Sequence, residues 1–474
     1  MVANDHFRKR DDCQSLNSTD CYRNALRSNQ SMRLRNRSID QPSIMKIQSA
    51  LIIGGLMVAK LISSQSYASE FANQSNWTGW RGPDQTNISP DTGLLKSWPE
   101  GGPKLLWTYE DAGTGYSSAA IVDGKLYTLG SRNRRELVIC LDANTGEELW
   151  TSEFETDPED GYRTQWGAGP RSTPTVSDGH VYALGVAGDI VCLTVDKGKR
   201  VWRKNLVRNF GGAVSKWGYS ESPSVDGDKV LVTPGGGKGA IVALNRKTGA
   251  TLWQSKKLKD PAEYSSVVVA DVDGQRQYIQ LFMNTLAGVD ASNGNLLWTS
   301  DWPQGRTAVI PTPIYRDGHV FMTSGYRAGA KLVKINGESA DVVWENQEMI
   351  NHHGGVVLVG DHVYGFSDQR KGNLMCIEFM TGEVAWMERV ERELHKGTVH
   401  AADGMLYCLN ENEGWVYLVE ASPLGFKEKG KFQLPKETAL RDENNGKVWA
   451  HPVVINGKLY LRDQDLIFCY DVKG

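Results

Sequence analysis

The 474-residue chain has no excess of charge of one sign. Its 53 Lys and Arg stand against 56 Asp and Glu, so the formal net charge is −3, and charged residues make up 23% of the chain. A nucleic-acid-binding surface needs a basic face, and an acidic tail needs a block of like charge. The sequence has neither pattern, and we expect no nucleic-acid partner.

Long apolar runs are also lacking. Residues 47–59 form a short run that follows Met45-Lys46 and is ended by Lys60, with Ser66-Tyr67-Ala68 soon after. A positive start, an apolar core and a small-x-small end are typical of a secretory signal. The run is too short to favour a membrane span.

These features predict that residues 45–68 are a signal peptide and that residues 1–44 are an over-long gene model, disordered if translated. The alternative is a genuine cytoplasmic tail ahead of a short membrane anchor. No cysteine follows the apolar run where a lipoprotein would need one. We therefore expect an exported protein, periplasmic or secreted, that is soluble and has no transmembrane segment after cleavage.

Helical periodicity is missing from the rest of the chain. Instead, one sequence motif, which we call the phrase, recurs every 40–50 residues or so. An apolar strand ends in Asp-Gly, two more strands follow, and Thr-Gly-x-x-x-Trp closes the phrase, as from Asp123-Gly124 to Trp150. Asp-Gly and Asn-Gly favour tight turns between antiparallel strands because glycine tolerates positive φ. The repeated tryptophan is large and flat enough to wedge between neighbouring sheets. Seven tryptophans occupy this position: Trp107, Trp150, Trp202, Trp253, Trp298, Trp344 and Trp386.

The eighth copy of the phrase, which opens at Asn456-Gly457, lacks its outer strand, and the chain stops at Gly474. A matching strand stands at the other end, in residues 103–107. A ring closed by this N-terminal strand explains both facts and protects open sheet edges. We predict an all-β fold, a single eight-bladed β-propeller of four-stranded antiparallel blades over residues 101–474, after an N-terminal extension at 69–100. The seventh copy has lost its closing Thr-Gly and Trp.

The stretch from Cys140 to Trp150, Cys-Leu-Asp-Ala-Asn-Thr-Gly-Glu-Glu-Leu-Trp, resembles the tryptophan-docking repeat of pyrroloquinoline quinone (PQQ) propellers. That family includes quinoprotein alcohol dehydrogenases and the outer-membrane assembly lipoprotein BamB, which has no cofactor. The resemblance covers about residues 100–474. The opening Trp77-Thr-Gly-Trp-Arg-Gly-Pro83 resembles the start of secreted PQQ-like propellers of planctomycetes. The resemblance implies the fold strongly and the activity weakly, because function lies in sites added to folds.

Ligands of propellers usually occupy the central channel, which the starts of the innermost strands line. Aligning the copies places large, polar and dissimilar residues two positions before a repeated small or hydroxyl residue. Divergence at a channel-facing position of a repeat indicates a specific site. The channel candidates for binding a cofactor or ligand are Tyr116, Arg171, Tyr219, Glu221, Tyr264, Lys396 and Trp449.

In this hypothesis Arg171 and Lys396 face an anion, Tyr116 and Trp449 offer stacking faces, and Glu221 is the candidate catalytic acid or base. Such a set would suit a quinone carboxylate or a sugar acid. The alternative is that these residues line a wet channel and bind nothing specific. Four histidines in three consecutive copies are weaker candidates for metal ligands, without a tight spacing motif: His352, His353, His400 and His451.

Two absences bear on the cofactor. The sequence has no adjacent pair of cysteines, whereas many quinoprotein dehydrogenases carry a disulfide between such a pair, and the chain is shorter than that class. Cys140, Cys192, Cys376 and Cys469 fall at one equivalent strand position, which predicts buried free thiols. The sequence therefore requires no cofactor, and PQQ with Ca²⁺ stays open.

Two functions remain after these exclusions. The first is a binding or scaffold protein of the cell envelope, monomeric, whose partner at the channel mouth is a small molecule, a glycan or an envelope protein. The alternative is a PQQ-dependent alcohol dehydrogenase, of the polyvinyl-alcohol type, or a sugar dehydrogenase. If the protein is an enzyme, a quinoprotein-type oxidoreductase is expected.

Overall fold

The computed structural model describes residues 75–155, 161–301, 308–368, 373–388, 396–441 and 446–474. All of them belong to one compact unit, Tyr67–Gly474. The expected signal peptide (residues 45–68) and the segment before it lie outside the described residues. Within the described part of the chain, no helix is long and apolar enough to cross a membrane.

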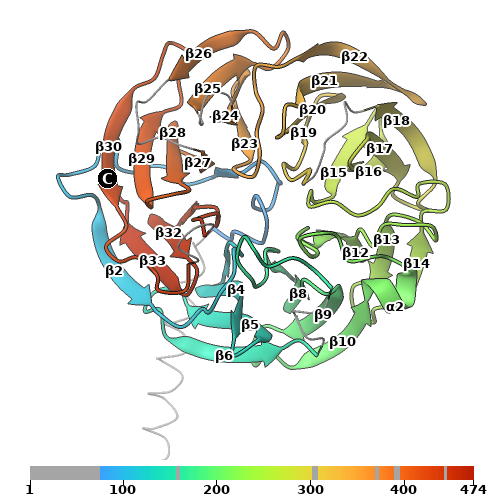
Figure 1. Ribbon diagram of the computed structural model, residues 1–474, viewed down its shortest axis with the longest axis horizontal. Helices are drawn as coiled ribbons and strands as arrows, with labels where there is room; N and C mark the ends of the chain where they lie inside the picture. Colours follow the sequence, from blue (N-terminus) through green and yellow to red (C-terminus); the bar gives the residue numbers. More distant parts are fainter. Residues whose placement is uncertain (1–74, 156–160, 302–307, 369–372, 389–395, 442–445) are drawn as a thin grey trace, which may run out of the picture. The chain divides into compact units, whose positions relative to one another are not determined.

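Eight antiparallel sheets follow one another around a ring (Figure 1), and we number these blades in chain order. Blade 1 consists of β3 (Ala120–Val122), β4 (Lys125–Arg132), β5 (Arg135–Asp142) and β6 (Glu148–Glu153). Blade 2 consists of β7 (Thr175–Ser177), β8 (His180–Leu184), β9 (Asp189–Thr194) and β10 (Arg200–Asn205). The short helix α2 (Leu206–Phe210) follows. Blade 3 consists of β11 (Ser224–Asp226), β12 (Lys229–Val232), β13 (Val242–Asn245) and β14 (Thr251–Gln254). Blade 4 consists of β15 (Val268–Val272), β16 (Gln275–Leu281), β17 (Thr285–Asp290) and β18 (Leu296–Asp301).

The second half of the ring repeats the arrangement. Blade 5 consists of β19 (Ile314–Arg316), β20 (His319–Ser324), β21 (Gly329–Asn336) and β22 (Ser339–Asn346). Blade 6 consists of β23 (Val356–Val359), β24 (His362–Ser367), β25 (Asn373–Glu378) and β26 (Val384–Glu388). Blade 7 consists of β27 (Gly397–Ala402), β28 (Met405–Asn410), β29 (Trp415–Glu420) and β30 (Glu428–Gln433). Blade 8 consists of β31 (Val453–Ile455), β32 (Lys458–Asp463) and β33 (Leu466–Asp471), together with β2 (Lys104–Tyr109).

The predicted eight-bladed propeller and its mode of closure are both confirmed. Strand β2 pairs antiparallel with β33, the last strand of the chain, and so completes blade 8. Figure 1 shows this blue strand beside the red C-terminal blade. This pairing covers the edge that β33 would otherwise leave open.

Local sequence explains how each blade forms. Asp123 and Gly124 both have positive φ, 49° and 73°, as the two-residue turn between β3 and β4 requires. In every blade the pairing of the third and fourth strands shifts by one residue, as between Cys140 and Leu141 opposite β6. Such a bulge re-aims the outer strand. It turns the repeated tryptophan toward the next blade.

The repeated tryptophans dock on the turn of the following blade. Trp150, for example, donates its indole N–H to the carbonyl of Val195 at 3.2 Å, and a side chain at Gly198 would collide with its ring. The same bond to the next blade is made by Trp107, Trp202, Trp253, Trp344 and Trp386. Because the tryptophan ring packs against the glycine of the turn in the next blade, Thr-Gly and Trp recur together in the repeat.

Two junctions depart from this pattern. Blade 5 turns at Asn336-Gly337 without a Thr-Gly, and Trp298 of blade 4 instead donates to Gln277 Oε1 of its own blade at 2.7 Å. Blade 7 has no closing tryptophan, and Trp98 of the N-terminal extension packs there against Phe432, with ring centroids 5.0 Å apart. The extension therefore fills the gap that the degenerate seventh repeat leaves.

The cysteines behave as the sequence predicts. Cys140, Cys192, Cys376, Cys408 and Cys469 are buried and unpaired with one another. Burial raises the pKa of the Cys376 thiol to about 11. These thiols act as small apolar residues inside separate blades.

The N-terminal residues 75–89, which we call the hub segment, run through the centre of the ring (blue in Figure 1). Hydrogen bonds link this segment to each of the eight blades: Ser75 with Asn456, Trp77 with Ile121, Thr78 with Val176, Trp80 and Arg81 with Thr312, Arg81 with Val356, Gln85 with Ser224 and Val267, and Asn87 with Val399. Its end forms β1 (Ile88–Ser89), which pairs parallel with β27. A single segment thus ties all the innermost strands together.

Candidate functional site

One hydroxyl position, repeated just before the innermost strands, links the blades around the channel. The Thr173 amide donates to Ser222 Oγ at 2.9 Å, the Ser222 amide to Ser266 Oγ at 2.9 Å, and the Ser266 amide to Thr312 Oγ1 at 3.3 Å. Each hydroxyl therefore accepts a bond from the same position of the preceding blade. These residues form the throat of the channel.

Above the throat, a cavity of about 420 Å³ opens where the residues preceding the innermost strands converge. This volume lies in the range of about 300–1,000 Å³ that is common for small-molecule sites. We call it the aromatic cavity. Its aromatic lining residues are Trp80, Tyr116, Trp166, Trp217, Tyr264, Tyr326, His352, His353, Trp449 and His451, and the charged ones are Arg171, Lys396, Glu411 and Lys447.

Trp449 stands at the centre of the aromatic wall, and its orientation is fixed. Its indole N–H donates to Glu411 Oε2 at 2.8 Å, and the same oxygen lies 2.8 Å from His353 Nε2. Burial works to raise the pKa of Glu411, but the bonds from His353 and Trp449 and the charge of Lys396 outweigh it and lower the pKa to about 2. Glu411 is therefore ionised and already engaged.

The rings of Tyr116 and Trp166 lie against Trp449, with centroids at 5.1 and 6.3 Å and interplanar angles of 44° and 35°. The Tyr116 hydroxyl donates to the carbonyl of Trp166. The inner end of the cavity is closed by Trp80 of the hub segment, whose indole meets the His451 ring edge-on at 4.6 Å. The rings thus form a wall and a floor at different tilts.

Three cations face this cavity. The Arg171 guanidinium lies 5.3 Å from the Tyr116 ring and donates to the carbonyls of Gly169 and Gly167. Among the described residues it has no carboxylate partner. Lys396 lies 3.2 Å from Asp368, and Lys447 donates to the Asn412 side chain at 2.6 Å. Glu411 is the only carboxylate among the described residues of the lining, so the three cations outnumber it and the cavity attracts anions.

Three polar atoms of the lining are buried and have no hydrogen-bond partner within the described chain: Nδ1 of His352, Nδ1 of His353 and the hydroxyl of Ser220. Burial, reinforced by the neighbouring His353 and Lys396, lowers the pKa of His352 well below its usual value, so the ring is neutral. A buried polar group left without a partner costs stability, which makes these three atoms candidates to bind a ligand.

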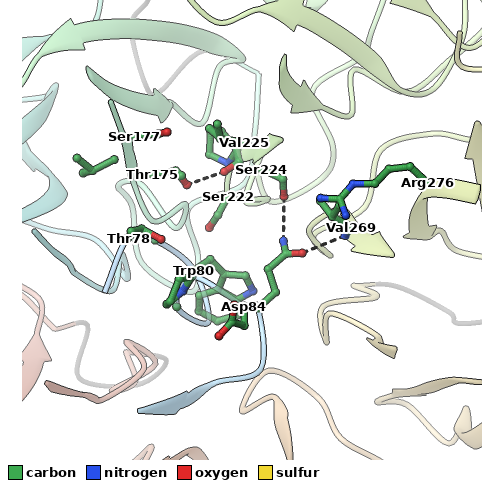
Figure 2. A pocket seen from close by; sticks show the side chains of 16 residues that line it. Thr78, Trp80, Asp84, Thr175, Ser177, Ser222, Ser224, Val225, Val269 and Arg276 are labelled. Atoms are coloured by element: carbon green, nitrogen blue, oxygen red, sulfur yellow. Dashed lines mark hydrogen bonds between the residues drawn. The ribbon is translucent and has the colours of Figure 1, made fainter. Parts of the chain in front are cut away.

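A second cavity, of about 360 Å³, lies on the other side of the hub segment, which we infer because Trp80 lines both cavities. Figure 2 shows this hydroxyl cavity, with Thr175, Ser177, Ser222 and Ser224 on one side and Asp84 at its edge. Most of its polar groups are used: Thr175 donates to the carbonyl of Pro223, and Gln85 donates to Ser224 Oγ at 3.2 Å. Arg276, also labelled in Figure 2, pairs with Asp226 at 2.8 Å.

The structure brings together most of the residues that the sequence nominated. Tyr116, Arg171, Tyr264, Lys396 and Trp449 all line the aromatic cavity. Three of the four nominated histidines join them: His352, His353 and His451. Among the described residues, however, no group of three or more His, Cys, Asp or Glu side chains is arranged to hold a metal ion.

Three nominated residues lie elsewhere, and their placement in the channel is corrected. Tyr219 and Glu221 flank the cavity-lining Ser220, and since successive side chains of extended backbone alternate in direction, both point into the blades. Tyr219 donates to the carbonyl of Pro234 at 2.9 Å, and Glu221 accepts from the Thr233 amide. His400, buried inside β27, lies 3.2 Å from Asn87 Oδ1 and supports the hub segment.

The pKa values agree with these structural roles. Burial raises the pKa of Glu221 to about 8, against the opposing bond from Thr233, and lowers that of His400 to about 3. Both side chains are therefore neutral near pH 7. Neither contacts the cavity.

Among the aromatic and charged residues of the lining, the sequence reasoning missed six: Trp80, Trp166, Trp217, Tyr326, Glu411 and Lys447. The tryptophans did leave a signal. The chain has 15 tryptophans and only seven belong to the docking repeat. Trp80, Trp166, Trp217 and Trp449 are among the surplus, and all four meet in this cavity.

The family model described as "Outer membrane protein assembly factor BamB" matches residues 134–388, more than half of the chain. BamB of Shewanella oneidensis is 26% identical over 239 residues, 46% of this chain and 57% of that protein. The quinoprotein ethanol dehydrogenase of Pseudomonas putida is 24% identical over 291 residues, 56% of this chain and 41% of that protein. The chain thus spans about half the length of these curated relatives.

Among solved structures, BamB of Moraxella catarrhalis superposes with a TM-score of 0.55 at 15% identity, covering 78% of this chain and 97% of that one. At this identity the likeness concerns the fold.

Proposed function

Because the chain belongs to the family of PQQ-repeat β-propellers described as outer membrane protein assembly factor BamB, we propose that it is a binding protein of the cell envelope. Its ligand is a small molecule that carries a carboxylate and occupies the aromatic cavity. One observation supports this most: aromatic walls, three cations and unused buried polar atoms converge at one end of the channel. Apolar walls with a few placed polar groups are the common form of a ligand site.

The geometry favours binding over catalysis. The single carboxylate of the described lining, Glu411, is held ionised by His353 and Trp449 and is not free to exchange a proton near neutral pH. No second carboxylate among these lining residues can act as its partner. The cavity therefore offers recognition groups, and it lacks a free acid–base pair.

The quinoprotein alternative fits the residues less well. In that class a Ca²⁺ ion accompanies the quinone, and Ca²⁺ takes six to eight oxygen ligands, several of them carboxylate or amide oxygens. The described lining offers one carboxylate, Glu411, whose Oε2 is taken by Trp449 and His353. These residues do not make a site for the ion, and we derive no redox step from them.

The binding function is tested by titrating the purified mature protein with carboxylates and following tryptophan fluorescence and heat. The probes are PQQ with and without Ca²⁺, benzoate and glucuronate. We expect saturable binding of at least one probe, weakened tenfold or more in Trp449→Ala. Asp84→Asn, in the hydroxyl cavity, is the matched control and should bind as the parent does. If no probe binds, or if Trp449→Ala binds unchanged, the proposal is wrong.

Export is part of the same proposal and rests on residues 45–68, which lie outside the described chain. The full-length gene expressed in a Gram-negative host should yield a periplasmic protein whose N-terminus is near Ser69. A cytoplasmic protein that retains residues 1–68 would overturn this part, and the cavity proposal would stand unaffected.

A further inference from the structure

We propose that the ligand of the aromatic cavity is an acidic sugar: a short uronate oligosaccharide, or the end of a uronate chain, bound through its carboxylate and its ring hydroxyls. This inference rests on the proposed function and names its ligand class. Four features of the lining support it.

The first is the tilt of the aromatic rings. Around Trp449 the neighbouring rings of Tyr116, Trp166 and His353 are inclined at 44°, 35° and 50°, and no parallel pair brackets a flat slot there. A planar aromatic ligand is held best between parallel or offset faces. Tilted faces suit a puckered pyranose, whose C–H bonds point in several directions and meet the electron-rich faces of rings.

The second feature is the set of unused polar atoms, which includes His352 Nδ1 and the Ser220 hydroxyl. Neutral His352 can donate or accept at Nδ1, and the Ser220 hydroxyl can do both at once. A sugar hydroxyl is likewise both donor and acceptor, so it can satisfy either atom. Each such bond would offset the cost of burying the group alone.

The third feature is the mixture of charges. Arg171 has no carboxylate partner among the described residues, and its planar fork can hold a carboxylate with two parallel bonds. Glu411 lines the same cavity and repels a ligand that carries negative charge all around. A uronate has one carboxylate at one edge and hydroxyls elsewhere, which matches a cavity with cations and an anion on different walls.

The fourth feature is the closed inner end. Trp80 is bonded through its indole N–H to Thr312 Oγ1 at 2.9 Å, and it stands between the two cavities. A polysaccharide therefore cannot thread through the channel. The cavity admits a free oligosaccharide or a chain end from the mouth.

The test is calorimetric titration with digalacturonate and with its neutral counterpart galactobiose. We expect the uronate to bind at least tenfold more tightly than the neutral sugar. Arg171→Gln should remove this preference, so that digalacturonate and galactobiose bind the variant with similar affinity. Arg135→Gln is the matched control, because Arg135 is an exposed arginine of blade 1 whose ion pair within the described residues is with Glu153 at the surface. It should behave as the parent protein.

Arg171 also bonds to the carbonyls of its own loop, so a second variant guards against misfolding. Lys447→Gln removes another lining cation, and we expect it to weaken uronate binding by about threefold to tenfold at an unchanged melting temperature. Equal affinity for the acidic and neutral disaccharides, or uronate binding that both variants leave intact, would overturn the inference.

Two outcomes separate this inference from the proposed function. If PQQ or benzoate binds in a Trp449-dependent manner and digalacturonate does not, the acidic-sugar inference fails and the binding function stands. If none of these carboxylates binds, both fail. Long polygalacturonate that binds in proportion to its chain ends supports entry from the mouth, whereas binding in proportion to its internal units contradicts it.

Discussion

The two cavities on either side of the hub segment are built from the same innermost strands, yet their linings differ. The hydroxyl cavity is lined by Thr175, Ser177, Ser222 and Ser224, and most of these groups bond to other parts of the chain (Figure 2). The aromatic cavity shares Ser222 with the hydroxyl cavity, and the rest of its lining is mostly large residues that differ from blade to blade, with polar atoms left over.

This difference separates scaffold from site. Residues that recur in each repeat form hydrogen bonds with one another and with the hub segment, because every blade must pack against its neighbours in the same way. Residues that differ between repeats do not serve that common purpose. In the proposed function, the residues that converge at one end of the channel serve a ligand, and the following predictions test that division.

The largest effect is expected at Arg81, on the scaffold side. Its guanidinium is buried and donates to the carbonyls of Thr312, Pro313 and Val356, joining blades 5 and 6. Arg81→Ala would leave these acceptors unsatisfied and open a void, at a cost of about 3 kcal/mol of unfolding free energy. Urea unfolding measures it. An unchanged denaturation midpoint would show that the hub segment contributes little to the ring.

An effect that depends on pH is expected at Glu221, which lies beside Ser220 and Ser222 but faces neither cavity. Burial raises its pKa to about 8 in the folded protein, whereas the unfolded chain has a value near 4.5. The folded state therefore keeps a proton that the unfolded state loses, and stability falls as the pH rises from 4.5 to 8. The loss amounts to up to about 1.4 kcal/mol per pH unit.

Glu221→Gln removes this contribution and leaves the other buried carboxyls in place. The melting temperature of the variant should fall less between pH 5 and pH 8 than that of the parent. Identical pH profiles for the two proteins would contradict the assignment of Glu221 to the blade interior.

A smaller effect is expected in the throat. Ser222→Ala removes the acceptor of the Thr173 amide and breaks one link of the hydroxyl chain. An unsatisfied buried amide costs about 1–3 kcal/mol, and we expect the lower end because the site is next to a cavity that water can enter. Thermal unfolding measures the change. A loss as large as that of Arg81→Ala would show that the throat, not the hub segment, is the main tie between blades.

The fold followed from the sequence because each repeat carries its own turn, bulge and docking tryptophan. Tyr116, Arg171, Lys396 and Trp449 were nominated from one register position and do line one cavity. The same reasoning failed at Glu221 because a neighbour in extended backbone points the opposite way. The hub segment could not be foreseen, since it is not part of the repeat and its partners lie in all eight blades.

The central claim is that ligand recognition belongs to the aromatic cavity and ring stability to the hub segment. The most direct measurement is a crystal structure of the mature protein soaked with digalacturonate. We predict that the sugar lies between Trp449 and Arg171, with its hydroxyls on His352 Nδ1 or Ser220. Sugar found in the hydroxyl cavity, beside Asp84 and Thr175, with the aromatic cavity holding only water, would contradict the account.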